Sequence, residues 1–184
     1  MGYLNIIMGP MYSGKSTELI RIYNKYKLKK KVLVINHKSD SRYGENSINT
    51  HNKNNLNCIS FDKLADYYTK FTNNLEDIYD IILIDESQFF NDLYDFCKTI
   101  VDTTNKTIYA FGLSGDYKRN KFGQLIDLIP IADDIKHLKS VCNKCKDIKD
   151  ASFTLRVCDN DQQILVGANE QYMAVCRDCW LKSN

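Results

Sequence analysis

The chain has 184 residues, of which 43% are hydrophobic and 26% charged, and its formal net charge is +2. This length allows one core of ordinary size with a small appended module, but not two full domains. The composition is that of a globular protein, and a charge so close to zero argues against a dedicated nucleic-acid-binding surface. No apolar run approaches the roughly 20 residues that span a bilayer, and the N-terminus does not resemble a signal peptide. We therefore expect a cytosolic protein without membrane or nucleic-acid partners.

The first motif directly follows an apolar run at residues 4–8. Glycines at positions 9 and 14, followed by Lys15 and Ser16, match the phosphate-loop pattern G-x-x-x-x-G-K-[ST]. The glycines allow a tight turn in which successive N–H groups point inward, and the next helix directs its positive end to the same place. Lys15 would contact the β- and γ-phosphates of a nucleoside triphosphate, and the Ser16 hydroxyl would bind the accompanying Mg²⁺.

Apolar runs and helical patterns alternate after this motif. Continuous apolar runs predict buried strands at 32–35, 81–84 and 107–111. Apolar spacing predicts helices at 15–28, 61–71, 93–100 and 125–131. The polar stretch 37–57 is interpreted as a long loop. Buried strands separated by helices favour an α/β fold with a doubly wound parallel sheet.

The strand at 81–84 ends in two adjacent carboxylates, Asp85 and Glu86. Downstream of a phosphate loop, one such carboxylate holds the metal, often through water, and the next can orient or deprotonate a nucleophile. Asp40 and Arg42 follow another strand, where open α/β sheets bind ligands, although two solvated surface charges would explain them equally well. The glycine-studded segment 112–123 fits either a substrate-side loop or an ordinary connector.

The cysteines separate into two groups. Four form a C-x2-C…C-x2-C pattern, namely Cys142, Cys145, Cys176 and Cys179. Four thiolates in two such pairs match a tetrahedral structural zinc site, and an iron–sulfur centre is the minor alternative. The other three are interpreted as buried small hydrophobes: Cys58, Cys97 and Cys158.

Two short alternating runs lie between the cysteine pairs, at 152–157 and 162–167. They predict a hairpin-like loop with no large core of its own. Zinc would hold the base of this loop and leave the rest free to move. Such a loop suits a lid over a pocket as well as a binding ribbon.

Together these motifs resemble the thymidine kinase family of the type shared by poxviruses, many bacteria and animal cytosol. The matching segments occur in family order and cover nearly the whole chain: 9–19, 40–43, 84–90, 118–123 and the two cysteine pairs. The resemblance implies a P-loop NTPase (RecA-like) domain over 1–140 and a zinc-binding lasso over 141–184 that forms a lid over the nucleoside. It also implies a homotetramer.

By this resemblance, the γ-phosphoryl group of ATP is transferred to the 5′-hydroxyl of thymidine, and also of deoxyuridine, in the salvage of DNA precursors. Glu86 would accept the hydroxyl proton. Asp85 and Ser16 would serve Mg²⁺, and Asp40 would act on the same ion indirectly. Lys15 and Arg42 would balance charge on the moving phosphoryl group. Thymidine triphosphate is expected to inhibit, because it can span both subsites.

The resemblance also implies two sets of binding residues. The set for ATP and Mg²⁺ is Gly9, Pro10, Met11, Tyr12, Ser13, Gly14, Lys15, Ser16, Thr17, Asp40, Arg42, Asp85 and Gln88. The set for the nucleoside is Met11, Phe89, Leu113, Tyr117, Phe122, Thr154, Leu165, Val166, Gly167 and Tyr172.

Five positions depart from the usual family pattern: Tyr12, Ser114, Asp116, Tyr117 and Lys121. They put the fine shape of the substrate loop in question but leave the catalytic assignment untouched.

Two other classes of protein share parts of the motif set. A nucleic-acid-dependent ATPase with a zinc ribbon would also have a phosphate loop and cysteine pairs, but the near-neutral charge argues against it. A GTP-dependent switch would need an Asn-Lys-x-Asp segment, which the chain lacks.

Overall fold

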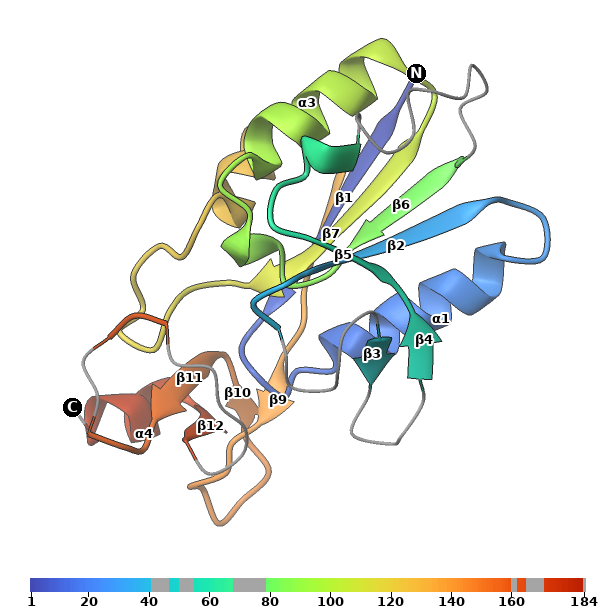
Figure 1. Ribbon diagram of the computed structural model, residues 1–184. Coiled ribbons are helices and arrows are strands. Elements are labelled where there is room, and N and C mark those ends of the chain that lie inside the picture. Colours follow the sequence, from blue (N-terminus) through green and yellow to red (C-terminus); the bar gives the residue numbers. More distant parts are fainter. Residues whose placement is uncertain (41–46, 50–54, 68–78, 160–161, 165–170, 184) are drawn as a thin grey trace.

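The computed structural model describes residues 1–40, 47–49, 55–67, 79–159, 162–164 and 171–183. Its central sheet has six strands in the order β5-β2-β6-β7-β1-β8 (Figure 1). They are β1 (Tyr3–Gly9), β2 (Val32–His37), β5 (Ile59–Phe61), β6 (Ile81–Ile84), β7 (Thr107–Leu113) and β8 (Asp134–His137). Every neighbouring pair is parallel, so the carboxyl ends of all six strands lie at the same edge.

Two helices cover opposite faces of the sheet, α1 (Lys15–Tyr26) and α3 (Leu93–Thr103) (Figure 1). Successive side chains of a strand point to opposite faces, so each strand contributes to both cores. Ile6 belongs to the buried cluster that contains Phe96 of α3, and Ile7 to the cluster that contains Leu19 of α1. The doubly wound parallel α/β sheet predicted from the sequence is therefore confirmed.

Shorter elements complete the described chain. Two 3-10 helices are η1 (Ser87–Phe89) and η2 (Leu125–Ile131), and a short α-helix is α4 (Arg177–Leu181). Three antiparallel pairs are β3 (Ser47–Asn49) with β4 (Asn55–Asn57), β9 (Ser140–Val141) with β10 (Asp150–Ala151), and β11 (Phe153–Arg156) with β12 (Tyr172–Val175). Elements β9 to β12 and α4, within residues 140–183, lie together at the end of the molecule toward which β7 points (Figure 1). We call residues 140–183 the C-terminal segment.

Three predicted elements differ from the structure. The helix expected at 61–71 does not begin at Phe61, which ends β5, and residues 68–71 lie outside the described chain. The loop expected at 37–57 contains the ladder β3–β4, in which Ile48 pairs with Leu56 and both are buried. The run at 152–157 forms β11, but its partner is β12 and not the run at 162–167. The helix predicted at 125–131 is confirmed with the same bounds, as a 3-10 helix with a proline inside it.

The cysteine interpretation is confirmed for Cys58 and Cys97, which are buried, and wrong for Cys158, which is exposed. In the part of the chain that is described, none of the helices combines the length and the apolar character that crossing a bilayer requires.

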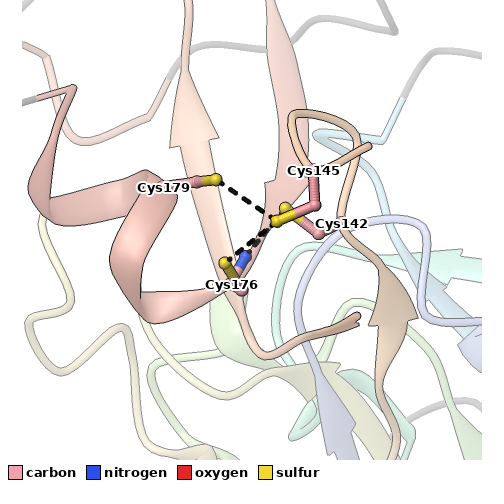
Figure 2. A group of neighbouring side chains, drawn as sticks. All are labelled: Cys142, Cys145, Cys176 and Cys179. Atoms are coloured by element: carbon pink, nitrogen blue, oxygen red, sulfur yellow. Dashed lines mark hydrogen bonds between the residues drawn. The ribbon is translucent and has the colours of Figure 1, made fainter. Parts of the chain in front are cut away.

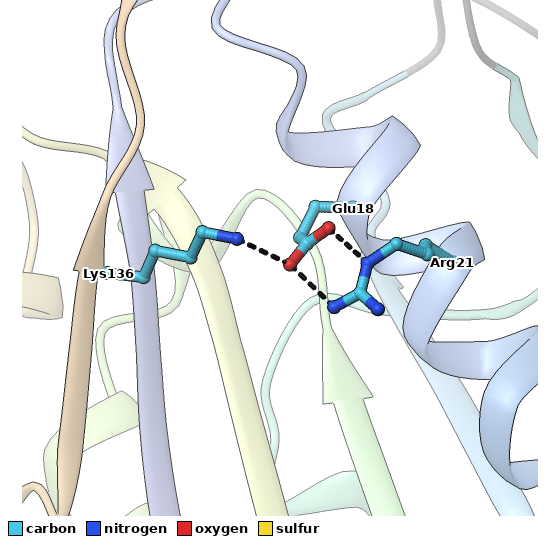
Figure 3. Close-up of polar contacts among 3 residues, drawn as sticks. All are labelled: Glu18, Arg21 and Lys136. Carbon is cyan, nitrogen blue, oxygen red and sulfur yellow. Dashed lines mark hydrogen bonds and ion pairs between the residues drawn. The ribbon is translucent and has the colours of Figure 1, made fainter.

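A carboxylate in the first turn of α1 ties this helix to the edge strand β8 (Figure 3). Glu18 accepts hydrogen bonds from Arg21 Nε at 2.6 Å and from Lys136 Nζ at 2.8 Å. The hydrogen bond from Arg21 is the largest influence that lowers the pKa of Glu18, to about 2, and the bond from Lys136 adds to it against the opposing effect of burial. The charged form of Glu18 therefore stabilises the fold.

We predict that Glu18→Gln lowers the free energy of unfolding by about 1 kcal/mol at pH 7, measured by urea titration. The pKa is lower in the folded chain than in the unfolded one, so the contribution is complete above about pH 4.5 and is lost as the pH falls toward about 2. Asp102→Asn, which removes the exposed pair with Lys98, is the matched control and should change stability less. An equal loss in the two variants would contradict the assignment.

Candidate functional site

The loop at residues 9–17 links the end of β1 to α1 and has the backbone that the phosphate-loop motif requires. Gly14 is the N-cap of α1 and has φ 83° and ψ 20°, a left-handed conformation that glycine adopts without steric cost. Tyr12 also has a positive φ, of 63°. Ser16 and Thr17 lie in the first turn of α1. The positive end of the α1 dipole therefore points into this loop.

Two residues of the loop make contacts that define its surroundings. Lys15 Nζ donates hydrogen bonds to the carbonyl oxygens of Pro10, at 2.7 Å, and Gly9, at 3.3 Å. The backbone N–H of Met11 donates to Thr154 Oγ1 of β11 at 3.0 Å. The loop is thus attached directly to the C-terminal segment, through a residue predicted from the family resemblance to lie in the nucleoside pocket.

Asp85 directly follows β6 and is only 4% exposed. The pKa of Asp85 is raised to about 7, first by burial and then by the negative charges of Glu86 and Asp40, against the lowering effects of the Glu86 N–H hydrogen bond and the Lys15 charge. Asp85 accepts a hydrogen bond from the Glu86 backbone N–H at 3.0 Å. The structure therefore brings the lysine of the loop into the electrostatic range of the strand-end carboxylates, as the two motifs together predict.

Glu86 is held by Gln88 in the tight turn after β6. The backbone of Glu86 is left-handed, with φ 48° and ψ 38°. This conformation is costly for any residue other than glycine, and residues that adopt it are common at functional sites. Gln88 Nε2 donates to Glu86 Oε2 at 2.5 Å, and Gln88 Oε1 accepts from the Leu113 N–H at 3.1 Å. Gln88 therefore links Glu86 to the end of β7.

Gln88 is 2% exposed, and two glycines leave room for it. A Cβ on Gly123, whose φ is 63°, would lie 2.0 Å from the Gln88 carbonyl oxygen. A Cβ on Gly112 would lie 2.6 Å from Gln88 Oε1. The turn that carries Glu86 is therefore packed against β7 and against the end of the 112–123 segment.

The end of β2 lies beside this turn. Asp40 Oδ2 accepts a hydrogen bond from Asn36 Nδ2 at 3.2 Å. His37 packs against Phe90 at 4.7 Å and Phe89 at 5.6 Å between ring centroids, and burial lowers the pKa of His37. Arg42, which the sequence places with Asp40, lies outside the described residues. The packing of His37 on Phe89 was not anticipated, because the sequence placed His37 at the start of a loop.

Aromatic side chains lie next to Glu86. Phe89 meets Phe122 edge to face, with ring centroids 5.6 Å apart, and Phe122 is buried. Leu113 ends β7, and Tyr117 follows it in the 112–123 segment. The structure thus brings these predicted nucleoside-binding residues to the carboxyl edge of the sheet. Three others, Leu165, Val166 and Gly167, lie outside the described residues.

The atypical Asp116 has a structural explanation. It is 7% exposed, and its Oδ1 accepts hydrogen bonds from the backbone N–H groups of Lys118 at 2.9 Å and Asn120 at 2.8 Å. Its Oδ2 accepts from Gln163 Nε2 at 2.9 Å. Asp116 therefore shapes the 112–123 segment from within and attaches it to the C-terminal segment. Trp180 Nε1 adds a second attachment by donating to the Tyr117 carbonyl oxygen at 3.0 Å.

The four cysteines predicted as metal ligands converge (Figure 2). The sulfur atoms of Cys142, Cys145, Cys176 and Cys179 all lie within 4.8 Å of one another. The Sγ atom of Cys145 is 3.6 Å from those of Cys176 and Cys179, too far for a disulfide. Tetrahedral zinc with bonds of about 2.3 Å would separate its sulfur ligands by about 3.8 Å. The donor set and its spacing therefore fit zinc.

The thiols of this cluster differ in acidity. Burial opposes ionisation of Cys142, but hydrogen bonds from the backbone N–H groups of Cys176, Lys144 and Cys145 lower the pKa of Cys142 to about 6. Hydrogen bonds with Cys179, Cys142 and Cys176 raise the pKa of Cys145 to about 12. Binding of a metal by these thiols requires the loss of their protons, so it should weaken as the pH falls.

Known proteins resemble this chain over nearly its whole length. The family model described as thymidine kinase matches residues 2–180. The chain belongs to the thymidine kinase family. A thymidine kinase of sheeppox virus is 39% identical over 180 residues, which cover 97% of either chain.

Two further relatives differ from each other in length. A thymidine kinase of vaccinia virus (strain Western Reserve) is 36% identical over 183 residues, which cover 99% of this chain and 98% of the viral one. A thymidine kinase of rice is 38% identical over 185 residues, which cover 98% of this chain and 66% of the rice protein.

A groove of about 570 Å³ is lined mainly by the C-terminal segment and the 112–123 segment, with Pro10 of the 9–17 loop at its side. Pro10, Ser114, Thr154 and Arg177 are among its lining residues, whereas Asp85, Glu86 and Phe89 are not. The groove therefore does not coincide with the carboxylate and aromatic cluster described above.

We predict that Asp85→Asn stabilises the ligand-free protein. Its melting temperature, measured at pH 8 in buffer that contains a chelator, should be about 5 °C higher than that of the parent. The pKa of Asp85 is raised in the folded state, so folding becomes less favourable as the pH rises from about 4 to about 7, and the amide removes this penalty. The gain should vanish near pH 4. Asp62→Asn is the control, because the pKa of Asp62 is lowered by a hydrogen bond with Lys38, and this variant should not gain stability. A destabilised Asp85→Asn would contradict the account.

We predict that Cys142→Ser lowers both the zinc content and the melting temperature, because a tetrahedral site that loses one thiolate binds metal more weakly. Zinc content is measured by elemental analysis of the purified protein, and unfolding by calorimetry. Cys158→Ser, at an exposed cysteine outside the cluster, serves as the control and should match the parent. Unchanged zinc content and stability in Cys142→Ser would show that the cluster has been misinterpreted.

Proposed function

We propose that this protein is an ATP:thymidine 5′-phosphotransferase that also accepts deoxyuridine. The observation that carries the proposal is the meeting of three parts at one edge of the sheet: the Lys15 loop, the carboxylates Asp85 and Glu86, and the Phe89–Phe122 aromatic pair. The thymidine kinase relatives support the choice of the nucleoside. Phosphoryl transfer depends mainly on positioning and charge stabilisation, which such an arrangement can supply.

The triphosphate would lie in the 9–17 loop, with backbone N–H groups and Lys15 against the β- and γ-phosphates. Ser16 and Asp85 would hold Mg²⁺, with Asp40 acting on it indirectly, and Arg42 would balance charge on the transferred group. Mg²⁺ would neutralise charge on the β- and γ-phosphate oxygens. Gln88 belongs to the same proposed set, and its hydrogen bond to Glu86 would also hold that carboxylate.

Glu86 would act as the base. The thymidine 5′-oxygen forms a bond to the γ-phosphorus, the bond from that phosphorus to the β–γ bridging oxygen breaks, and the hydroxyl proton passes to the Glu86 carboxylate. The products are thymidine monophosphate and ADP. Gln88 orients the carboxylate by its hydrogen bond, and the buried turn limits the positions that Glu86 can take.

The base of the nucleoside would be held in the aromatic pocket. The residues we propose for it are Met11, Phe89, Leu113, Tyr117, Phe122, Thr154, Leu165, Val166, Gly167 and Tyr172. A pocket closely packed around a pyrimidine would exclude purines, whereas the 5-methyl group alone would distinguish thymidine from deoxyuridine by only about 1–3 kcal/mol of binding free energy.

We further propose a kinase domain over 1–140 and a zinc-stabilised lasso over 141–184. From the family resemblance we also propose that the protein is a cytosolic homotetramer. It would be inhibited by thymidine triphosphate and would serve the salvage of DNA precursors.

The activity is tested by incubating the protein with ATP, Mg²⁺ and each of thymidine, deoxyuridine, deoxycytidine and deoxyguanosine. We expect monophosphates from thymidine and deoxyuridine only. A parallel arm measures ATP hydrolysis with single-stranded DNA and no nucleoside. Strong stimulation by DNA without any nucleoside phosphorylation would overturn the proposal in favour of a nucleic-acid-dependent ATPase.

We predict that Glu86→Gln reduces kcat by at least about 100-fold, because the amide cannot accept the hydroxyl proton. Binding of ATP and of thymidine, measured by calorimetry, should change little. Asp95→Asn, at an exposed carboxylate of α3, controls for loss of negative charge and should turn over normally. Near-normal turnover by Glu86→Gln would refute its role as the base.

A further inference from the structure

Arg156 is a charged side chain that the proposed reaction leaves without a role. It lies in β11 and is 8% exposed. Holding a guanidinium group in so buried a position requires hydrogen-bond acceptors arranged around it. The groups that surround it come from three separate parts of the chain, and each of these parts includes or adjoins a residue proposed for the nucleoside pocket.

The first part is the neighbouring strand. Arg156 and Tyr172 are register partners in the β11–β12 ladder. Arg156 Nη2 donates a hydrogen bond to Tyr172 Oη at 2.5 Å, and the guanidinium carbon is 5.1 Å from the centroid of the same ring. The hydrogen bond limits the positions of the phenol group of Tyr172.

The second part is the short described stretch 162–164. Arg156 Nη1 donates to the carbonyl oxygen of Gln162, and Nη2 donates to that of Gln163 at 3.2 Å. Gln163 lies two residues before Leu165, the first of the proposed lid residues Leu165, Val166 and Gly167. The guanidinium therefore anchors the backbone from which the proposed lid residues continue.

The third part is the 112–123 segment. The guanidinium carbon of Arg156 lies 3.8 Å from the centroid of the Tyr117 ring, within the range of a cation–π contact. The Asp116–Gln163 hydrogen bond and the Trp180 bond to the Tyr117 carbonyl hold the backbone around this ring. Arg156 contacts the ring itself, and Lys118 Nζ lies farther from the same ring centroid, at 5.4 Å.

We propose that Arg156 is a positioning residue for the nucleoside pocket, fixing Tyr117, Tyr172 and the backbone at 162–163 in one arrangement. The inference rests on the proposed function and extends it to a residue outside the binding set. The guanidinium group of Arg156 donates hydrogen bonds to three acceptors while its flat face stacks on an aromatic ring, so both its planar set of N–H donors and its planar charge are needed. A lysine ammonium, as a point charge, cannot meet both requirements.

The test compares steady-state kinetics of Arg156→Met and Arg156→Lys with those of the parent protein, varying thymidine and ATP separately. We expect the KM for thymidine to rise at least 10-fold in Arg156→Met and about 5-fold in Arg156→Lys, while the KM for ATP stays within two-fold. Arg177→Met is the matched control, because Arg177 is an exposed arginine that contacts the Phe153 ring, 4.9 Å from its centroid. It should leave both KM values unchanged.

Two further measurements separate positioning from general damage. Zinc content should remain at the parent level in both variants. In Arg156→Ala, millimolar guanidinium should recover part of the lost thymidine affinity, an effect that a purely structural defect would not show. If the Met and Ala variants fail to fold, Tyr172→Phe removes one acceptor while keeping the ring, and should raise the KM for thymidine about 3-fold.

An unchanged KM for thymidine in variants that fold, or a parallel rise in the KM for both substrates, would overturn the inference. Failure of the parent protein to phosphorylate thymidine is a different result and would overturn the proposed function instead.

Discussion

The parallel pairing of β6 with β7 and of β7 with β1 is the constraint on which the candidate site depends. It brings the carboxyl ends of these strands to one edge, so that the 9–17 loop after β1 and the Asp85–Glu86 pair after β6 face the same region. The pairing has an energetic cost, because Asp85 is buried and ionises only at a raised pKa. A cation bound beside it would offset that cost, as expected for a carboxylate that serves a metal–nucleotide complex.

The second constraint is the attachment of the C-terminal segment to this edge. Thr154 accepts a hydrogen bond from Met11 of the loop, Gln163 donates one to Asp116, and Trp180 donates one to the Tyr117 carbonyl. Trp180 directly follows Cys179 in α4. A metal held by the cysteine cluster would therefore affect the 112–123 segment through α4.

The parts of the fold that could be predicted from the sequence are those with strong local patterns. The strands at 32–35, 81–84 and 107–111 are continuous apolar runs, and the 9–17 loop and cysteine pairs have spacings that few other structures require. The edge strand β8 was missed because all four of its residues are exposed and show no apolar pattern. The partner of β11 was misassigned because strand pairing depends on tertiary contacts rather than on nearby sequence.

The roles of Gln88, Asp116 and Arg156 could not be predicted for a related reason. Each has at least one partner distant in sequence, namely Leu113 for Gln88, Gln163 for Asp116 and Tyr117 for Arg156, and no spacing rule connects these pairs. Asp116 could be recognised only as a departure from the family pattern. Its three hydrogen bonds show that the departure has a defined structural use.

The central claim is that one site is formed jointly by the 9–17 loop with its carboxylates and by the C-terminal segment. Calorimetric binding of Mg²⁺–ATP and of thymidine, each to the zinc-loaded and to the zinc-depleted protein, tests it most directly. We expect zinc removal to weaken thymidine binding at least 10-fold and to leave the affinity for Mg²⁺–ATP within about three-fold of its starting value. Thymidine binding that is unaffected by zinc removal would contradict it.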